Sequence, residues 1–132
     1  MPVNKLFNWT FALFFSFTAG SAFALSTTIE IVNNTSSNAS LTSPSYTGVI
    51  TPALPNPLSP LSNSIHVSTS SGLADAGTFY YSACRFNWSV INQGGGFYTF
   101  SIGAQPSSRC SSNVLVQNAF TGEYSIQFFV DI

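Results

Sequence analysis

The chain has 132 residues, of which 45% are hydrophobic, 15% are aromatic and only 5% are charged. Residues 25–132 carry two basic residues, Arg85 and Arg109, against four carboxylates, which gives a net charge of about −2. Two separated arginines cannot neutralise a run of phosphates or form a polybasic segment. The composition therefore excludes nucleic-acid binding and charge-driven attachment to anionic lipid.

The first residues have the three parts of a secretory signal. Lys5 supplies a positive charge, residues 6–18 form an apolar run, and residues 22–24 read Ala-Phe-Ala, a small-residue cleavage site. A membrane anchor is the alternative, but the run is shorter than the ~20 apolar residues that a spanning helix needs. We expect residues 1–24 to be a cleaved signal peptide and residues 25–132 to form one domain that is secreted or periplasmic.

Beyond the signal, apolar residues recur with a period of two, which is typical of β-strands. The glycine triplet at residues 94–96 can turn the chain, so Trp88 and Phe100 are expected on neighbouring strands of one hairpin. In chain order, the predicted strands are residues 28–32, 39–42, 65–69, 78–83, 85–90, 98–102, 113–117 and 124–130.

One stretch interrupts this pattern, because residues 51–60 contain four prolines. Proline cannot donate a ladder hydrogen bond, so the stretch is predicted to be a loop bridging two sheets, with a proline-rich ligand segment as the alternative. Seven to eight short strands without a helical period predict an all-β fold, an antiparallel β-sandwich. A small barrel is the second architecture that this pattern fits.

The only two cysteines, Cys84 and Cys110, both follow the signal. An even count in an exported chain predicts a structural disulfide. A redox pair would need a C-x-x-C spacing, and a metal site would need further ligands that the single His66 and the scattered carboxylates do not supply. We expect no metal and no cofactor.

Catalytic residues are not indicated by any spacing in the chain. His66 lies between two apolar residues, so alternation places it on the solvated face of a strand rather than in a catalytic pair. Asp75 is expected in a loop at residues 71–77 and Glu123 in a turn, and nothing in the spacing sets two carboxylates across a cleft. The sequence therefore predicts that the protein is not an enzyme.

The aromatic residues are the most suggestive feature for function. Strand alternation directs Phe97 and Phe129 outward, and either Tyr80 or Tyr81 must also leave the core. If these side chains cluster, they form an exposed apolar patch of the kind that marks a partner or membrane surface. The alternative is that a second sheet or the proline-rich loop covers them.

Four segments of the amino-terminal half occur in a recognisable order. A strand at residues 29–35 is followed by a Gly-and-Pro crossover at residues 46–52, a Ser-rich strand at residues 64–70 and a Gly-led tyrosine strand at residues 75–81. This layout resembles that of the aegerolysins, which are small acidic β-sandwiches that recognise membrane lipids. The resemblance implies lipid recognition through exposed aromatic residues, and no individual lipid-contact residue is carried over.

The sequence thus favours an exported, non-catalytic β-sandwich that acts as a binding or structural module. Its partner is an unidentified protein, glycan or membrane lipid, and oligomerisation is left open. The second hypothesis is an aegerolysin-like protein that binds membrane lipid.

Overall fold

A computed structural model describes residues 24–131, and these form nine β-strands. The expected signal peptide lies outside this range except for Ala24. The strands are β1 Leu25–Asn33, β2 Leu41–Tyr46, β3 Val49–Thr51, β4 Ser62–Ser70, β5 Ala74–Tyr81, β6 Cys84–Gly94, β7 Phe97–Gln105, β8 Cys110–Gln117 and β9 Tyr124–Val130. No helix within residues 24–131 is long and apolar enough to cross a membrane.

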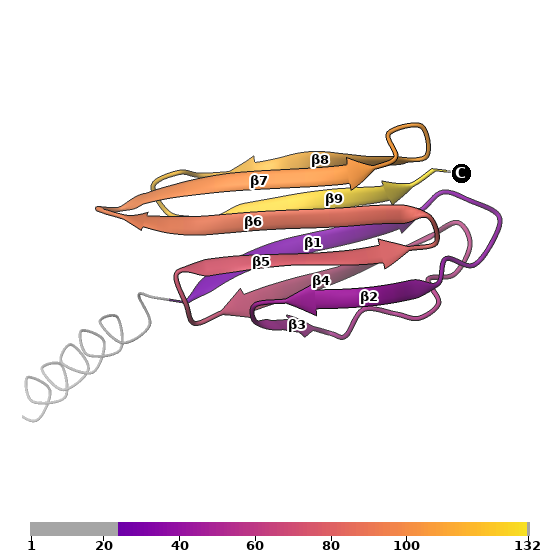
Figure 1. Ribbon diagram of the computed structural model, residues 1–132, viewed down its shortest axis with the longest axis horizontal. Helices are drawn as coiled ribbons and strands as arrows, with labels where there is room; N and C mark the ends of the chain where they lie inside the picture. Colours follow the sequence, from indigo (N-terminus) through magenta and orange to yellow (C-terminus); the bar gives the residue numbers. More distant parts are fainter. Residues whose placement is uncertain (1–23, 132) are drawn as a thin grey trace, which may run out of the picture.

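The strands form two sheets that pack face to face (Figure 1). One has the order β3-β4-β1-β9-β8 and the other the order β2-β5-β6-β7. Neighbouring strands are antiparallel except for β1 and β9, which pair in parallel. The predicted all-β sandwich is confirmed, with nine strands instead of seven to eight. The additional strand is β3, whose three residues are too few to show an alternation in the sequence.

An aromatic core fills the space between the sheets. The rings of Phe86 and Phe128 stack across it with centroids 4.7 Å apart, and Phe79 meets Phe128 edge-on at 5.7 Å. Trp88 packs beside Phe79 at 6.0 Å, and all four side chains are buried. Because β6 and β9 belong to different sheets, these ring contacts hold the two layers together.

The proline-rich stretch is a loop, as predicted, but it connects β3 and β4, which are neighbours in the same sheet. It reaches the other sheet only through contacts. The Tyr81 hydroxyl donates to the Pro55 carbonyl at 2.6 Å, and Asn56 Oδ1 accepts from the Leu41 backbone N–H at 3.1 Å. Leu54 and Leu58 of the loop are buried, so the loop closes this part of the core.

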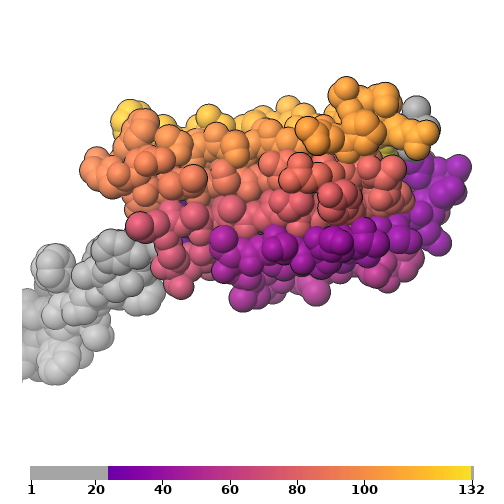
Figure 2. Space-filling model, in the orientation of Figure 1, coloured from indigo at the N-terminus to yellow at the C-terminus, as the bar shows by residue number. Residues whose placement is uncertain are grey.

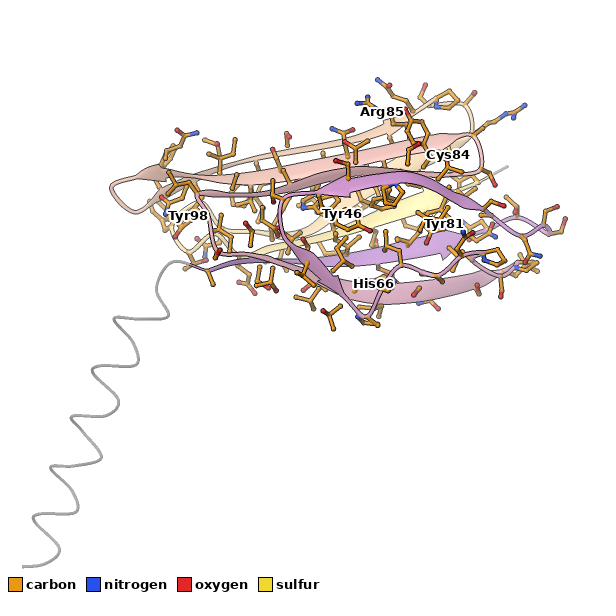
Figure 3. The ribbon with its side chains drawn as sticks, turned by 60° about the horizontal axis from the view of Figure 1, so that its bottom comes forward. Tyr46, His66, Tyr81, Cys84, Arg85 and Tyr98 are labelled. Atoms are coloured by element: carbon orange, nitrogen blue, oxygen red, sulfur yellow. A yellow bond between two sulfur atoms is a disulfide. The ribbon has the colours of Figure 1, made fainter. Side chains whose placement is uncertain are left out.

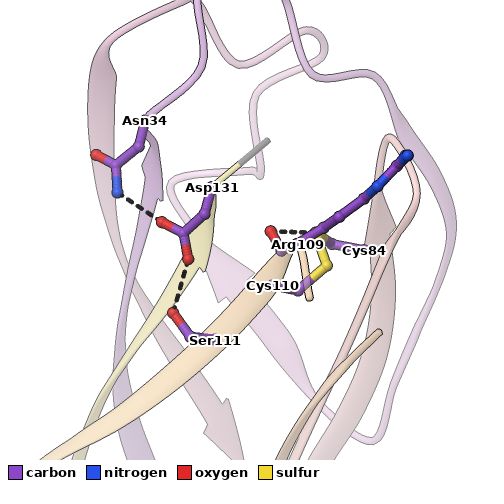
Figure 4. Close-up of a disulfide and its surroundings, with 6 residues drawn as sticks. All are labelled: Asn34, Cys84, Arg109, Cys110, Ser111 and Asp131. Atoms are coloured by element: carbon purple, nitrogen blue, oxygen red, sulfur yellow. Dashed lines mark hydrogen bonds between the residues drawn. A yellow bond between two sulfur atoms is a disulfide. The ribbon is translucent and has the colours of Figure 1, made fainter. Parts of the chain in front are cut away.

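The predicted disulfide is confirmed. Cys84 at the start of β6 and Cys110 at the start of β8 are bonded, with Cα atoms 5.7 Å apart, and both residues are buried (Figure 4). Because the two strands belong to different sheets, the bond joins the layers covalently. A buried disulfide is compatible with an oxidising compartment, such as the periplasm or the extracellular space.

Candidate functional site

His66 is buried, which corrects the prediction that it is solvated. Only 1% of its surface is exposed, whereas its neighbours Ile65 and Val67 point outward. His66 Nδ1 lies 2.6 Å from the Pro52 carbonyl, which can only accept, so Nδ1 carries a proton. His66 Nε2 lies 2.6 Å from the Ser64 hydroxyl. Both ring nitrogens are therefore engaged, and the histidine fastens the proline-rich loop to β4.

Asp75 is also misplaced by the sequence, since it lies in β5 rather than in a loop and is fully buried. Asp75 Oδ1 accepts from the Ser68 hydroxyl at 2.7 Å. The Thr27 hydroxyl lies close enough to lower the pKa of Asp75, yet neither Thr27 Oγ1 nor Asp75 Oδ2 meets the geometry of a hydrogen bond. Burial outweighs both hydroxyls and raises the pKa of Asp75 above its usual 3.8.

This raised pKa predicts that Asp75→Asn stabilises the protein at neutral pH. The folded state binds a proton that the unfolded chain has released, so stability falls as pH rises from about 4 through the folded pKa. An asparagine keeps the acceptor for Ser68 and removes the buried charge, so the free energy of unfolding should rise by about 1 kcal/mol at pH 7 and not at pH 3. Thermal midpoints across that range measure this. Glu123→Gln, at an exposed position, is the control and should give the same profile as wild type.

Glu30 is the carboxylate at the centre of the outer face of the five-stranded sheet. Its two oxygens accept from Asn63 Nδ2 at 2.6 Å and Gln127 Nε2 at 2.7 Å, and Gln127 in turn accepts from Asn113 at 3.0 Å. The hydrogen bond from Gln127, followed by that from Asn63, lowers the pKa of Glu30. An ionised carboxylate held in this way connects four neighbouring strands and is unsuited to proton transfer.

The four aromatic candidates do not gather into one patch. Phe97 is 49% exposed at one end of the sandwich, whereas Phe129 is half-buried on the outer face of the five-stranded sheet, where it pairs with Val32. Tyr80 is half-buried on the outer face of the other sheet. Tyr81 is fully buried and is therefore wrong as a contact candidate. Of the four, Phe97 alone is substantially exposed.

Phe97 belongs to a group that we call the apolar tip, made by three connections at one end of the sandwich. Its members are Leu73 between β4 and β5, Ile91 and Phe97 of the β6–β7 hairpin, and Phe120 between β8 and β9. Leu73 is 70% exposed and Phe120 is 79% exposed. These connections lie at the left of Figure 1, where β1 begins. Leu73 and Phe120 protrude from loops, whereas Ile91 and Phe97 belong to the strands of the hairpin.

Backbone hydrogen bonds fasten the three connections to one another. The Asn92 N–H donates to the Leu73 carbonyl at 2.8 Å, and the Tyr98 N–H donates to the Ala119 carbonyl at 2.8 Å. The backbones of the three connections are therefore held to one another and do not form three independent loops.

Local sequence explains how the tip residues are presented. The triplet Gly94, Gly95 and Gly96 has φ values of 88°, 65° and 75°, which side-chain-bearing residues rarely adopt, so the hairpin turns tightly and Phe97 follows at once. In the β8–β9 connection, Asn118 Oδ1 accepts from the Phe120 backbone N–H at 2.9 Å. This Asx turn holds the backbone while the phenyl ring remains in solvent.

The basic residues lie away from the tip, whereas one exposed carboxylate, Glu123, follows Phe120 in the β8–β9 connection. Arg85 and Cys84 lie at the opposite end from Tyr98, which is next to Phe97 (Figure 3), and Arg109 lies beside the disulfide (Figure 4). Asp131 is at that end as well, where it accepts from Asn34 and Ser111. A partner that meets the tip therefore encounters apolar side chains without basic groups.

The sequence identified one tip residue and missed the others. Phe120 lies in a segment with turn composition, Asn118 to Gly122, and Leu73 lies within the loop predicted at residues 71–77. A large apolar residue isolated in a turn was the available signal. Which turns share an end, however, depends on the strand order. No group of three or more His, Cys, Asp or Glu that could hold a metal ion occurs in residues 24–131.

The two packed sheets, the bridging disulfide and the exposed tip define a small disulfide-linked β-sandwich. IP-1A from Alcaligenes faecalis shares the fold with a TM-score of 0.55 and 12% identity, over 84% of this chain and 94% of that one. RahU, solved in complex with a TRIS molecule, gives a TM-score of 0.53 and 12% identity, over 81% and 94%. At this identity the likeness shows the fold alone. No protein-family model and no curated protein matches the chain.

Proposed function

We propose that the chain is an exported, non-catalytic binding module whose contact surface is the apolar tip. The observation that carries the proposal is the exposure of Leu73, Phe97 and Phe120 on the three connections at one end. Large exposed apolar side chains that cluster on a soluble domain mark interaction surfaces, whereas isolated ones need no explanation. Loops held by a rigid scaffold are also where binding residues are commonly found.

The state of the titratable groups favours binding over catalysis. The nitrogens of His66 are engaged by Pro52 and Ser64, Glu30 is held by two amides, and Asp75 is buried in the core. A general base needs access to a substrate proton, and none of these three groups combines access with a free acceptor atom. We therefore assign the protein no reaction.

A membrane lipid is the second, narrower candidate for the partner. It is favoured by the tip, because exposed apolar side chains at the end of a domain can enter a lipid interface. The resemblance of residues 29–81 to the aegerolysin layout points to the same partner class. Without arginine or lysine at the tip, such binding would depend on apolar burial and would change little with salt.

The experiment compares the mature protein with the triple variant Leu73→Ser, Phe97→Ser and Phe120→Ser. We expect the wild type to co-sediment with vesicles of phosphatidylcholine and cholesterol, and the variant to lose at least about tenfold in partitioning, because three apolar side chains no longer leave water. Two matched controls should bind like wild type. Leu61→Ser removes a side chain that is 74% exposed at the other end, and Phe129→Ser removes a ring from a sheet face.

Light scattering on the same set separates the partner classes. One outcome is that the wild type fails to bind vesicles but forms an oligomer, while the triple variant is monomeric. That result would assign the tip to protein contacts and reject the lipid candidate. If the triple variant matched the wild type in both vesicle binding and oligomeric state, the tip would not be the contact surface and the proposal would be wrong.

A further inference from the structure

The outer face of the four-stranded sheet carries a hollow of about 380 Å³, and none of the residues that line it belongs to the apolar tip. Figure 2 views this face directly, with β2 in purple below β5, β6 and β7. Two of the residues that line the hollow are the aromatics Tyr46 and Trp88, and the other eight are short and neutral. They include Ser45, Ala76, Thr78, Asn87, Ser89 and Ser101.

Strand pairing explains why a hollow forms at this position. Ser89 of β6 is paired with Ala76 of β5 and Ser101 of β7, so one row across three strands has only one- and two-atom side chains. In the next row, Asn87 is paired with Thr78 and with Gly103, which has no side chain. A sheet face with two adjacent rows of small residues is lower there than at its ends.

Larger residues border the two small-residue rows along the strands. Tyr80 pairs with Arg85 on one side, and Ile91 pairs with Ala74 and Thr99 on the other. Longer side chains therefore flank the two small-residue rows along the strands. Among the lining residues themselves, Tyr46 is an aromatic residue that is only half-buried.

The polar groups in the hollow offer donors and acceptors without charge. Ser89 Oγ and Ser101 Oγ are 2.7 Å apart, so one hydroxyl donates to the other and the second keeps a proton for a ligand. The Asn87 amide lies across Gly103, with Oδ1 2.5 Å from where a Cβ would stand, and presents a carbonyl and an amino group together. Thr78 and Ser45 add two more hydroxyls.

We infer that this hollow binds a neutral, polyhydroxylated ligand, namely a short segment of an oligosaccharide. Sugar hydroxyls both donate and accept, so they match a lining of hydroxyls and a side-chain amide. A phosphate or carboxylate ligand would need a basic residue among the lining residues, a cation would need carboxylates, and the hollow is lined by neither. Tyr46, a half-buried residue of the lining, provides the ring against which a sugar face can pack. The inference does not depend on the tip.

The test is a nuclear magnetic resonance titration of the ¹⁵N-labelled mature protein with maltotriose, cellotriose and tri-N-acetylchitotriose at millimolar concentrations. We expect at least one of them to shift amide signals of β5, β6 and β7 around Ala76 and Asn87. Ala76→Phe should fill the hollow and weaken that binding at least tenfold. The matched control, Thr28→Phe on the outer face of the other sheet, should leave it unchanged.

A gentler pair of variants keeps the test decisive if Ala76→Phe does not fold. Ser101→Ala and Asn87→Ala remove hydrogen-bonding groups without adding volume, and each should weaken binding several-fold. The inference is overturned if none of the three saccharides shifts any signal, if the shifts map to another surface, or if binding survives in the filled variant. The tip triple variant should bind saccharide like wild type, so this site and the tip can fail separately.

Discussion

Asn33→Asp is expected to destabilise the sandwich by about 3 kcal/mol or more. Asn33 is fully buried, and its Nδ2 donates to the carbonyls of Ser37, Leu58 and Ser59 at 2.8, 3.1 and 3.1 Å. Its Oδ1 accepts from the Thr35 backbone N–H and hydroxyl at 3.0 and 2.6 Å. Aspartate has the same shape but sets an oxygen against three carbonyl oxygens, so the donor is lost and a charge is buried.

Urea denaturation at pH 7 measures this effect as a lower midpoint with an unchanged slope. Asn38→Asp is the matched control, because Asn38 lies exposed in the same connection between β1 and β2 and should change stability by less than about 0.5 kcal/mol. Equal losses in the two variants would mean that Asn33 does not fasten the connection to the proline-rich loop.

Removing the disulfide is the second large effect. Cys84 and Cys110 are 26 residues apart, and closing a loop of that length stabilises the folded state by about 3 kcal/mol in the chain-entropy model. Since the bond joins the two sheets at the end opposite the tip, we expect reductant to lower the thermal midpoint by roughly 10 °C. The double variant Cys84→Ala and Cys110→Ala should melt at the lower temperature with or without reductant. If reductant left the thermal midpoint of the wild type unchanged, the bond would contribute nothing to stability.

The core could be predicted because large apolar residues alternate with polar residues along the central strands. The alternating apolar residues of two strands are buried as expected, namely Phe86, Trp88 and Val90 on β6 and the apolar positions of β9. Large rings and branched side chains on one face of a strand determine that this face points into the core. The hairpin predicted from the glycine triplet is also confirmed, and Val90 pairs with Phe100 across it. In these segments local pattern and tertiary packing agree.

Strand β4 shows where the same reasoning fails. Alternation gives the period of a strand but not which face is buried, and the apolar residues Ile65 and Val67 suggested the inner face. In the structure the two faces are exchanged, and Ile65 and Val67 point outward. The inner face of β4 carries His66 and Ser68, which form hydrogen bonds with the Pro52 carbonyl and with Asp75. Buried polar residues with partners in distant segments leave no local signal.

The tip was only partly predictable for a related reason. Phe97 follows a glycine turn and could be recognised, whereas Leu73 and Phe120 become its neighbours only through the strand order. Tyr80 and Tyr81 illustrate the limit within one strand. The pattern required one of them to face outward, and the contact of the Tyr81 hydroxyl with the Pro55 carbonyl decides which.

The most direct measurement on the apolar tip uses Phe120→Trp in a protein of residues 25–132, whose own Trp88 is buried in the core. If the tip is the contact surface, vesicles of phosphatidylcholine with brominated acyl chains should shift the new indole emission to the blue and quench it, while the matched Leu61→Trp variant keeps its water-exposed spectrum. An indole at residue 120 that stays in water beside vesicles, in a protein that elutes as a monomer, would contradict the assignment.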